Sequence, residues 1–296
     1  MIIDSSDCIS PPFFVNIESF IITLLLMPEL PEVETVKQGL QFLIKTSITA
    51  CELINSQLRW PVDPLIPQKI TQQCILDITR RAKYIVIKLR HGSLIIHLGM
   101  TGVLYVCQSH VSRKKHDHVI FTLSNNIELR YHDVRRFGSI HWAPHPIMQH
   151  RLLFQLGPEP LSDSFNPSSL HATLSTVKKS IKSTLLDQKI VVGIGNIYAN
   201  EILFAAGIHP CRLSNSLRID ECKLLVKHTQ SILTKAIALG GTTLKDFLNP
   251  QAKPGYFQQT LHVYGRKDQP CTHCHTNLAH IMHGQRTTVF CPTCQK

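Results

Sequence analysis

The stretch Met27-Pro28-Glu29-Leu30-Pro31-Glu32-Val33-Glu34-Thr35 organises the interpretation of the whole chain. From it, apolar residues recur at a spacing typical of one helix face: Leu30, Val33, Val36, Leu40, Leu43 and Ile44. Pro31 suits a first helical turn, and the glutamates suit the positive end of the helix dipole. The stretch therefore predicts an amphipathic helix, and a plain capped surface helix fits these residues equally well.

In a protein that begins at Pro28, this residue would carry a free amine. An N-terminal proline carries a free secondary amine with a pKa near ~8, and a helix N-terminus lowers that pKa further. Attack of such an amine on an aldehyde carbon gives a cationic iminium, which is an electron sink for elimination. Pro28 is therefore a candidate nucleophile, on the condition that Met27 is the true start.

Residues 1–26 do not resemble part of the fold. The apolar run at 17–26 is too short to span a bilayer, and no Lys or Arg precedes Lys37, unlike a signal peptide. We expect this segment to be an upstream start or a disordered leader. In the full chain, we expect the N-terminus to adopt an inactive form, with the leader in or displaced from the substrate pocket.

Composition limits the classes of function. The 296 residues suffice for two domains and a small appendage, and the net charge of +11 predicts a polyanionic partner, nucleic acid before an acidic membrane. Four of the ten cysteines form two C-x-x-C pairs, and the other six are scattered. This usage is typical of a reducing cytosol, so we expect a cytoplasmic protein, and no segment suggests a membrane span.

The hydrophobic period changes along the chain. Between residues 48 and 142 it is that of short strands joined by close turns, which predicts an antiparallel β-sandwich. A proline-rich linker follows, and after it the period is helical, near 168–176, 180–188, 197–206 and 219–239. The prediction is an α+β chain in which an N-terminal helix and β-sandwich precede a helical domain and a C-terminal metal-bound β-hairpin. The expected boundaries are 27–143, 144–167, 168–250 and 251–296.

Two glycine-rich points flank the third and fourth helical windows. Val192-Gly193-Ile194-Gly195-Asn196 opens a helix, where backbone N–H groups can approach a phosphate, although a plain turn between helices explains it equally well. Gly240-Gly241-Thr242-Thr243 follows the long helix and is interpreted as a helix cap or the start of a mobile loop.

The strongest local motif lies in the tail. Cys271-x2-Cys274 and Cys291-x2-Cys294 have the spacing of two knuckles that place four thiolates around one Zn²⁺. Because all four ligand positions are filled, the predicted site is structural, and a hairpin this small depends on the metal to fold. Its tip carries Arg286, either as a solvated residue or as a phosphate contact.

From Met27 onward, the chain resembles the formamidopyrimidine-DNA glycosylases, bacterial base-excision enzymes for oxidised purines. Besides the opening stretch and the four cysteines, the resemblance rests on these motifs: Arg80-Arg81-Ala82-Lys83-Tyr84, His97-Leu98-Gly99-Met100-Thr101-Gly102, Lys115-His116-Asp117-His118, Arg135-Arg136-Phe137-Gly138, residues 156–161, residues 192–201 and residues 240–243. Leu30 favours this branch over the related endonuclease VIII branch.

The resemblance implies catalytic roles. Pro28 would attack the sugar C1′ of a flipped nucleotide, Glu29 would donate or shuttle the proton that opens the sugar, and Glu32 would support the N-terminus. Lys83 would donate the proton in β-elimination and contact phosphate, although Arg80, Arg81 and Lys83 could also be a solvated cluster. Arg286 would assist δ-elimination and hold the phosphate of the flipped nucleotide.

The resemblance also implies DNA contacts. His116, Arg135 and Asn196 would bind DNA, Asn196 from a helix–two-turn–helix. Met100, Arg135 and Phe137 would fill the space left by the extruded base, because apolar and planar groups replace the missing stacking. Without the resemblance, Met100 and Phe137 would be interpreted as core residues. The loop at 240–250 would close over the lesion.

Two departures from the family pattern bear on this interface. Val134 stands where the family has proline, which we expect to loosen the loop around Arg135. Val177 stands where a basic DNA contact is usual, and Lys178 or Lys179 could substitute.

The sequence thus predicts a monomeric glycosylase and AP lyase that acts on damaged duplex DNA and excises oxidised purines such as formamidopyrimidine and 8-oxoguanine. An endonuclease VIII-like enzyme for oxidised pyrimidines is the alternative. A non-catalytic binder of damaged DNA is a further one, if the leader stays attached.

Overall fold

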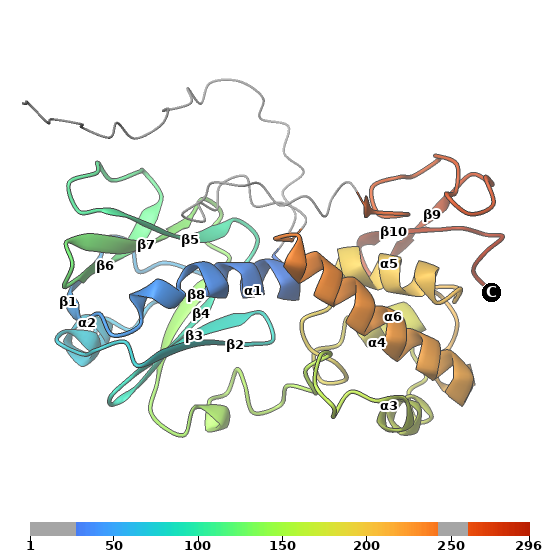
Figure 1. Cartoon of the computed structure of the whole chain (residues 1–296), viewed down its shortest axis with the longest axis horizontal. Coiled ribbons are helices and arrows are strands. Elements are labelled where there is room, and N and C mark those ends of the chain that lie inside the picture. Colours follow the sequence, from blue (N-terminus) through green and yellow to red (C-terminus); the bar gives the residue numbers. More distant parts are fainter. Residues whose placement is uncertain (1–27, 242–259) are drawn as a thin grey trace, which may run out of the picture.

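The structure is a computed structural model that describes residues 28–241 and 260–296. The expected leader at 1–26, and the loop at 240–250 beyond Gly241, lie outside the described residues. Figure 1 shows a lobe of sheets and a lobe of helices, with helix α1 (Leu30–Gly39) running from one to the other. Leu30, Val33 and Val36 are fully buried, as the helical spacing predicts, and α1 packs against both β2 and α6.

The first lobe is the predicted antiparallel sandwich. Its core lies between two four-stranded sheets, and alternate residues such as Ile85, Ile87, Leu94 and Ile96 point into it. One sheet has the order β1-β6-β7-β5, formed by Ile48–Leu53, Asp117–Leu123, Ile127–Asp133 and Gly102–Gln108. The other has the order β2-β3-β4-β8, formed by Asp77–Arg81, Tyr84–Leu89, Gly92–His97 and Ser139–Ala143. Short helices η1 (Gln41–Leu43) and α2 (Ile66–Ile70) complete the lobe.

The proline-rich segment at 144–167 packs on the sandwich. It contains the short helix η2 (Ile147–Gln149), and its Leu153 is buried against Ile95 and Ala143 on the outer face of the second sheet. The segment is therefore folded onto the first lobe before it reaches the helices.

The second lobe has a separate apolar core. Helix α5 (Asn196–Ala205) lies at its centre, and eight of its ten residues are buried. The lobe also contains α3 (Pro167–Leu174), α4 (Ile181–Leu185), η3 (Ser214–Ser216) and α6 (Ile219–Ala238). None of the helices in the described residues is sufficiently long and apolar to cross a membrane.

The C-terminal hairpin pairs β9 (Ala279–His283) with β10 (Arg286–Phe290). Its small core contains Val263, Leu278 and Val289, together with Phe204 of α5. Figure 1 shows the hairpin beside α5, so this helix lies between the hairpin and the N-terminal end of α1.

Candidate active site and metal centre

Glu29 is bound by the first turn of α5. Its carboxylate accepts hydrogen bonds from the backbone N–H groups of Gly195 (2.7 Å), Ile197 (2.9 Å) and, more weakly, Tyr198 (3.4 Å). The side chain is only 3% exposed, and this burial raises the pKa of Glu29 to about 7 despite the amide donors. A carboxyl group with this pKa is present in both protonation states near neutral pH, as proton transfer requires.

The glycine-rich turn fits closely around this carboxylate. A Cβ atom at Gly195 would lie 2.3 Å from Cδ of Glu29, and one at Gly193, which has a φ of +83°, would collide with Leu30. Leu30 N–H in turn donates to the carbonyl of Gly193. The sequence left open a phosphate contact or a plain turn between helices, and the structure shows a third role, because amides of this turn bind the protein's own Glu29 carboxylate.

Glu32 lies under the same site. One of its carboxylate oxygens accepts the backbone N–H of Glu29 at 3.0 Å, and the other accepts the hydroxyl of Tyr198 at 2.8 Å. The side chain is buried. Glu32 therefore fixes the backbone immediately after Pro28 relative to α5.

Lys83 lies in the tight turn between β2 and β3. Burial lowers the pKa of Lys83, and the neighbouring Arg286 lowers it further, whereas Glu29 and Glu32 raise it. Lys83, Glu29 and Arg286 thus lie within range of one another's charge, although they come from three separate segments of the chain.

The turn that carries Lys83 is held by Glu159 of the linker. The Glu159 carboxylate accepts the backbone N–H of Ala82 at 2.7 Å, and it forms ion pairs with Arg80 (2.7 Å) and Arg81 (2.8 Å). Arg80 also pairs with Glu34 of α1 at 2.9 Å. For Arg80 and Arg81, the solvated-cluster interpretation is wrong, because both are largely buried and neutralised by acids that are distant in sequence.

Arg286 is exposed at the start of β10, and three contacts dock its hairpin onto the helices. Asn196 donates to the carbonyl of Thr287 at 3.2 Å, Lys182 donates to the Thr288 hydroxyl at 2.7 Å, and Asn200 accepts the N–H of Val289 at 3.2 Å. The cysteine spacing alone predicts a tip held only by metal. In the structure, that tip is also bound to α4 and α5.

His283 adds a contact on the other strand. Its Nε2 lies 2.7 Å from the hydroxyl of Ser180 and 2.8 Å from that of Ser183, both in the first turn of α4. Sequence reasoning missed His283 and Lys182, because only the folded chain brings their partners to them.

Lys182 is fully buried between α4, α5 and β10. Its Nζ donates to Thr288 and, at 3.2 Å, to Asn200, and no carboxylate in the described part of the chain pairs with it. Burial lowers the pKa of Lys182 to about 7, and the charge of Arg286 contributes to this lowering.

The four predicted metal ligands come together. The sulfur atoms of Cys271, Cys274, Cys291 and Cys294 all lie within 4.8 Å of one another, and none forms a disulfide. The separations are 3.9 Å for Cys271–Cys294 and 3.4 Å for Cys274–Cys291. Four thiolates at about 2.3 Å from one Zn²⁺ would be ~3.8 Å apart, so the donor set fits the ion.

Hydrogen bonds to Asp133 hold the loop that carries Arg135 and Phe137. The Asp133 carboxylate accepts the Gly138 N–H at 2.8 Å and the Thr101 hydroxyl at 2.5 Å, and Thr101 accepts the Arg135 N–H at 3.0 Å. These side-chain hydrogen bonds constrain the loop at Val134, where the family has proline, and the expected loosening stays a prediction. Phe137 is 43% exposed, with the Arg135 guanidinium 4.6 Å from its ring centroid, so it is not a core residue.

The other predicted DNA contacts are accessible. Met100 is half-buried, and Asn196 is the first residue of α5. His116 is partly exposed in the turn before β6, with its ring centroid 5.8 Å from that of His132. Its pKa is lowered by partial desolvation and by the neighbouring histidines and basic residues.

His97 is a further candidate, which sequence reasoning did not single out. Burial, together with the charges of Lys83 and Arg59, lowers the pKa of His97 to about 4. Its Nδ1 accepts the Gly99 N–H at 3.0 Å, so the neutral ring carries its proton on Nε2. The histidine is a fixed neutral donor beside Lys83, and its place in the motif at 97–102 was the available signal.

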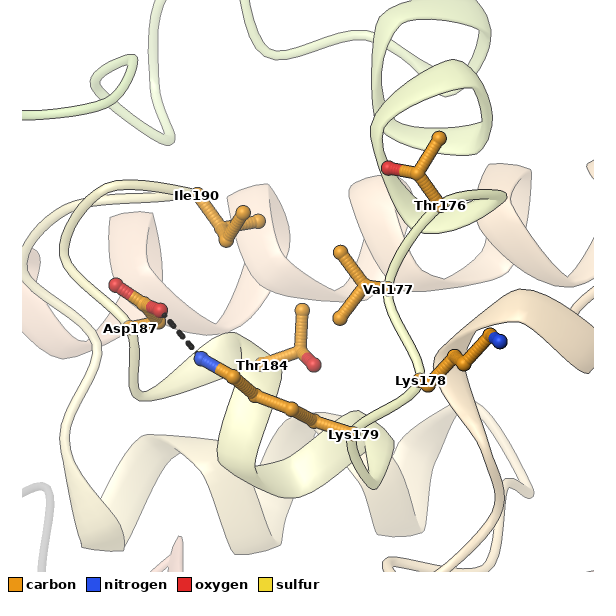
Figure 2. Close-up of a pocket in the computed structure, with 7 residues that line it drawn as sticks. All are labelled: Thr176, Val177, Lys178, Lys179, Thr184, Asp187 and Ile190. Carbon is orange, nitrogen blue, oxygen red and sulfur yellow. Dashed lines mark hydrogen bonds and ion pairs between the residues drawn. The ribbon is translucent and has the colours of Figure 1, made fainter.

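A pocket of about 350 Å³ lies next to α4. Figure 2 shows the residues that line it. Lys179 extends across it to Asp187, with an ion pair of 3.0 Å, whereas Lys178 extends in a different direction. Val177 also lines the pocket. Of the two lysines beside Val177, only Lys178 is without an ionic partner in the described part of the chain.

Family models match both lobes. Residues 27–140 match the formamidopyrimidine-DNA glycosylase N-terminal domain, and residues 156–248 match the formamidopyrimidine-DNA glycosylase H2TH domain. The chain combines a β-sandwich, a helix–two-turn–helix lobe and a four-cysteine hairpin, with Pro28 and Glu29 where they meet. This combination defines the class of helix–two-turn–helix DNA glycosylases.

Comparison with whole proteins gives the family. The chain is 49% identical over 271 residues to formamidopyrimidine-DNA glycosylases of Hydrogenovibrio crunogenus and Escherichia coli, which covers 91% of this chain and 97% and 100% of those proteins. The structure matches Lactococcus lactis Fpg (MutM) in complex with DNA that contains N7-benzyl-Fapy-dG, with a TM-score of 0.84, 33% identity and coverage of 91% of this chain and 100% of that chain. A complex of the same enzyme with abasic-site DNA matches with the same TM-score and identity, over 90% of this chain and 99% of that chain. The chain therefore belongs to the formamidopyrimidine-DNA glycosylase family, whose members are DNA repair glycosylases with AP lyase activity.

Proposed function

We propose that this chain, in a form that begins at Pro28, removes oxidised purines from duplex DNA and then cuts the strand at the abasic site. The amine of Pro28 attacks C1′ of the damaged nucleotide, and the base departs with the electrons of the glycosidic bond. The resulting iminium makes the C2′–H and then the C4′–H acidic, so that loss of these protons to water expels the 3′ and then the 5′ phosphate by β- and δ-elimination. The observation that carries the proposal is the buried Glu29 next to Pro28, with a pKa raised to about 7.

Glu29 supplies the proton that opens the sugar ring. Its carboxyl is held by the α5 amides one residue from the Pro28 nitrogen, and it is available in protonated form near neutral pH. Glu32 positions this pair through the Glu29 N–H and Tyr198.

Lys83 and Arg286 act on the later steps. A half-buried lysine with a lowered pKa is a better proton donor than an ordinary lysine, which suits a role in β-elimination. The exposed guanidinium of Arg286 can bind a phosphate with two parallel hydrogen bonds, and it thereby stabilises the charge of the departing phosphate in δ-elimination.

The remaining residues bind and reshape DNA. His116 and Asn196 contact the phosphate backbone, and Lys178 supplies the cation that Val177 lacks. The wedge consists of Met100, Arg135 and Phe137, whose partly apolar and planar groups occupy the gap left when the damaged nucleotide leaves the stack. The exposure of Phe137 supports this role, because an apolar ring at the surface gains from contact with bases.

One structural Zn²⁺ is bound by Cys271, Cys274, Cys291 and Cys294. When bound, the ion neutralises the thiolates and fixes the hairpin, which in turn carries Arg286. Metal analysis of reduced protein is expected to give one zinc per chain, and substitution of any one cysteine is expected to abolish it. Absence of zinc from the freshly purified protein would contradict this part of the proposal.

Borohydride trapping tests the chemistry. Protein that begins at Pro28 is expected to form a covalent adduct with a duplex that contains 8-oxoguanine, because borohydride reduces the iminium. Protein in which residues preceding Pro28 remain attached has an amide nitrogen there and is expected to form no adduct. Failure of the protein that begins at Pro28 to be trapped would overturn the proposal, and adduct formation only on oxidised pyrimidines would move the substrate to the endonuclease VIII class.

The protein is proposed to act as a cytoplasmic monomer on chromosomal DNA. The scattered cysteines among residues 28–241 form no disulfide, which supports a reducing compartment.

A further inference from the structure

Two arginines from distant segments meet on one tryptophan at the surface of the sandwich. The Arg59 guanidinium lies 4.8 Å from the ring centroid of Trp60, and that of Arg151 lies 5.4 Å from it. Both arginines are exposed. A guanidinium on an indole ring keeps its charge while its orientation is restricted, so the entropy cost of binding an anion is smaller.

Neither arginine is neutralised by the protein. Ion pairs hold Arg80 and Arg81 to Glu159, and Arg113 to Glu52. No carboxylate in residues 28–241 or 260–296 pairs with Arg59 or Arg151. Two like charges placed together without counter-charges form a surface that gains from a polyanion.

Neutral rings lie behind these charges. The ring centroid of His141 is 5.5 Å from that of Trp60 and 5.8 Å from that of His150. Burial lowers the pKa of His141 to about 4, and that of His150 is lowered as well, so both rings are neutral at physiological pH. The charge of the surface therefore comes from the arginines, and it is insensitive to pH.

The surface is continuous with the candidate active site. The backbone N–H of Arg59 donates to the carbonyl of Gly138 at 3.1 Å, next to Phe137 in the wedge loop. On its other side, the charge of Arg59 acts on His97 together with that of Lys83. A strand that contacts the wedge and Lys83 would therefore pass close to Arg59.

We infer that Arg59, Trp60 and Arg151 form a contact surface for the phosphate backbone of DNA that flanks the lesion, beyond the nucleotide that enters the active site. The inference rests on the proposed function, which supplies the DNA. The surface is indifferent to base sequence, because charged groups that contact phosphates carry no information on the bases. This surface increases the number of phosphates that the protein contacts on one arm of the duplex.

The test compares binding of the wild type and of the R59A/R151A double variant to duplexes with an uncleavable abasic analogue. On a duplex with two long arms, the double variant is expected to lower the slope of log K against log salt by about 0.9 for each phosphate that the variant no longer binds. On a duplex shortened in the arm that meets the surface, the two proteins are expected to bind alike. R59K/R151K is expected to restore the slope, because it restores the charge.

Arg90→Ala is the matched control, since this exposed arginine lies in the turn between β3 and β4, at the end of the second sheet away from Gly138. It is expected to leave the salt slope unchanged. An unchanged slope for R59A/R151A on every duplex, with folding intact by circular dichroism, would overturn the inference. Borohydride trapping at saturating DNA separates the two proposals: absence of wild-type trapping refutes the proposed function, whereas trapping with an unchanged slope refutes only this surface.

Discussion

The Glu29 carboxylate accepts the backbone N–H of Ile197 at 2.9 Å, although the two residues are 168 positions apart in the chain. The contact joins the start of α1 to the start of α5. Asn196 and Asn200 of the same helix bind the hairpin that carries Arg286. One buried helix thus sets the distance between the groups proposed for the first and the last steps of the reaction.

Replacement of Glu29 by Gln removes an acid while it keeps the shape of the side chain. We expect E29Q to slow base excision by about 10²–10⁴-fold, the usual contribution of a positioned proton donor. The wild-type rate is expected to fall as the pH rises through about 7, where Glu29 loses its proton, and E29Q is expected to lack this descending limb. Single-turnover excision as a function of pH measures both effects. If the rate of E29Q still fell as the pH rose through about 7, the titrating group would be one other than Glu29.

His283 is expected to position Arg286 through the two serines of α4. H283A should leave Schiff-base trapping intact, yet raise the fraction of product that stops after β-elimination, because the δ-elimination step needs the phosphate contact. Gel analysis of the product ends gives this ratio. Met282→Ala is the control, since Met282 is 68% exposed on the same strand. Equal product ratios for H283A and the wild type would show that the hairpin needs no such anchor.

Lys182 makes stability depend on pH. Its pKa falls from an ordinary 10.5 to about 7 on folding, so between these values the unfolded chain holds a proton that the folded chain has released. Wild-type stability from this group therefore rises as the pH increases from 7 to 10. We expect the Tm difference between the wild type and K182M to shift in favour of the wild type over that range. Lys189→Met, at an exposed lysine, should show no such trend. A constant Tm difference for K182M would contradict the assignment.

Lys178 and Lys179 are adjacent, and they are expected to differ in DNA binding. K178A should lower the salt slope of binding by about 0.9, the effect of leaving one phosphate unbound. K179A should leave it unchanged, because the Lys179 charge is paired with Asp187. Titration of both variants with the same duplex at several salt concentrations distinguishes the two lysines. The opposite ranking would show that DNA displaces Asp187.

Local patterns predicted the elements and the metal ligands. The spacing from Leu30 predicted α1, strand alternation predicted the sandwich, and the two C-x-x-C pairs predicted a cluster that the fold assembles. These signals are local because periodicity and ligand spacing are properties of short segments.

Features that depend on distant residues were not predictable from the sequence. Glu159 neutralises Arg80 and Arg81 from the linker, and the burial of Lys182 depends on β10. The raised pKa of Glu29 requires the enclosure supplied by α5. The family resemblance supplied candidate residues for catalysis, whereas the folded chain supplied the contacts that hold them.

The contact between Glu159 and the Lys83 turn also limits how the protein can be re-engineered. A segment between domains is usually the first choice for inserting a tag, splitting a gene or moving the termini. Here Leu153 of the segment packs on the sandwich, and the Glu159 carboxylate accepts the backbone N–H of Ala82. A cut or an insertion near Glu159 would release the turn that carries Lys83. The exposed turn at Arg90 and His91, at the other end of the sheet, is a safer site for an insertion or for new termini.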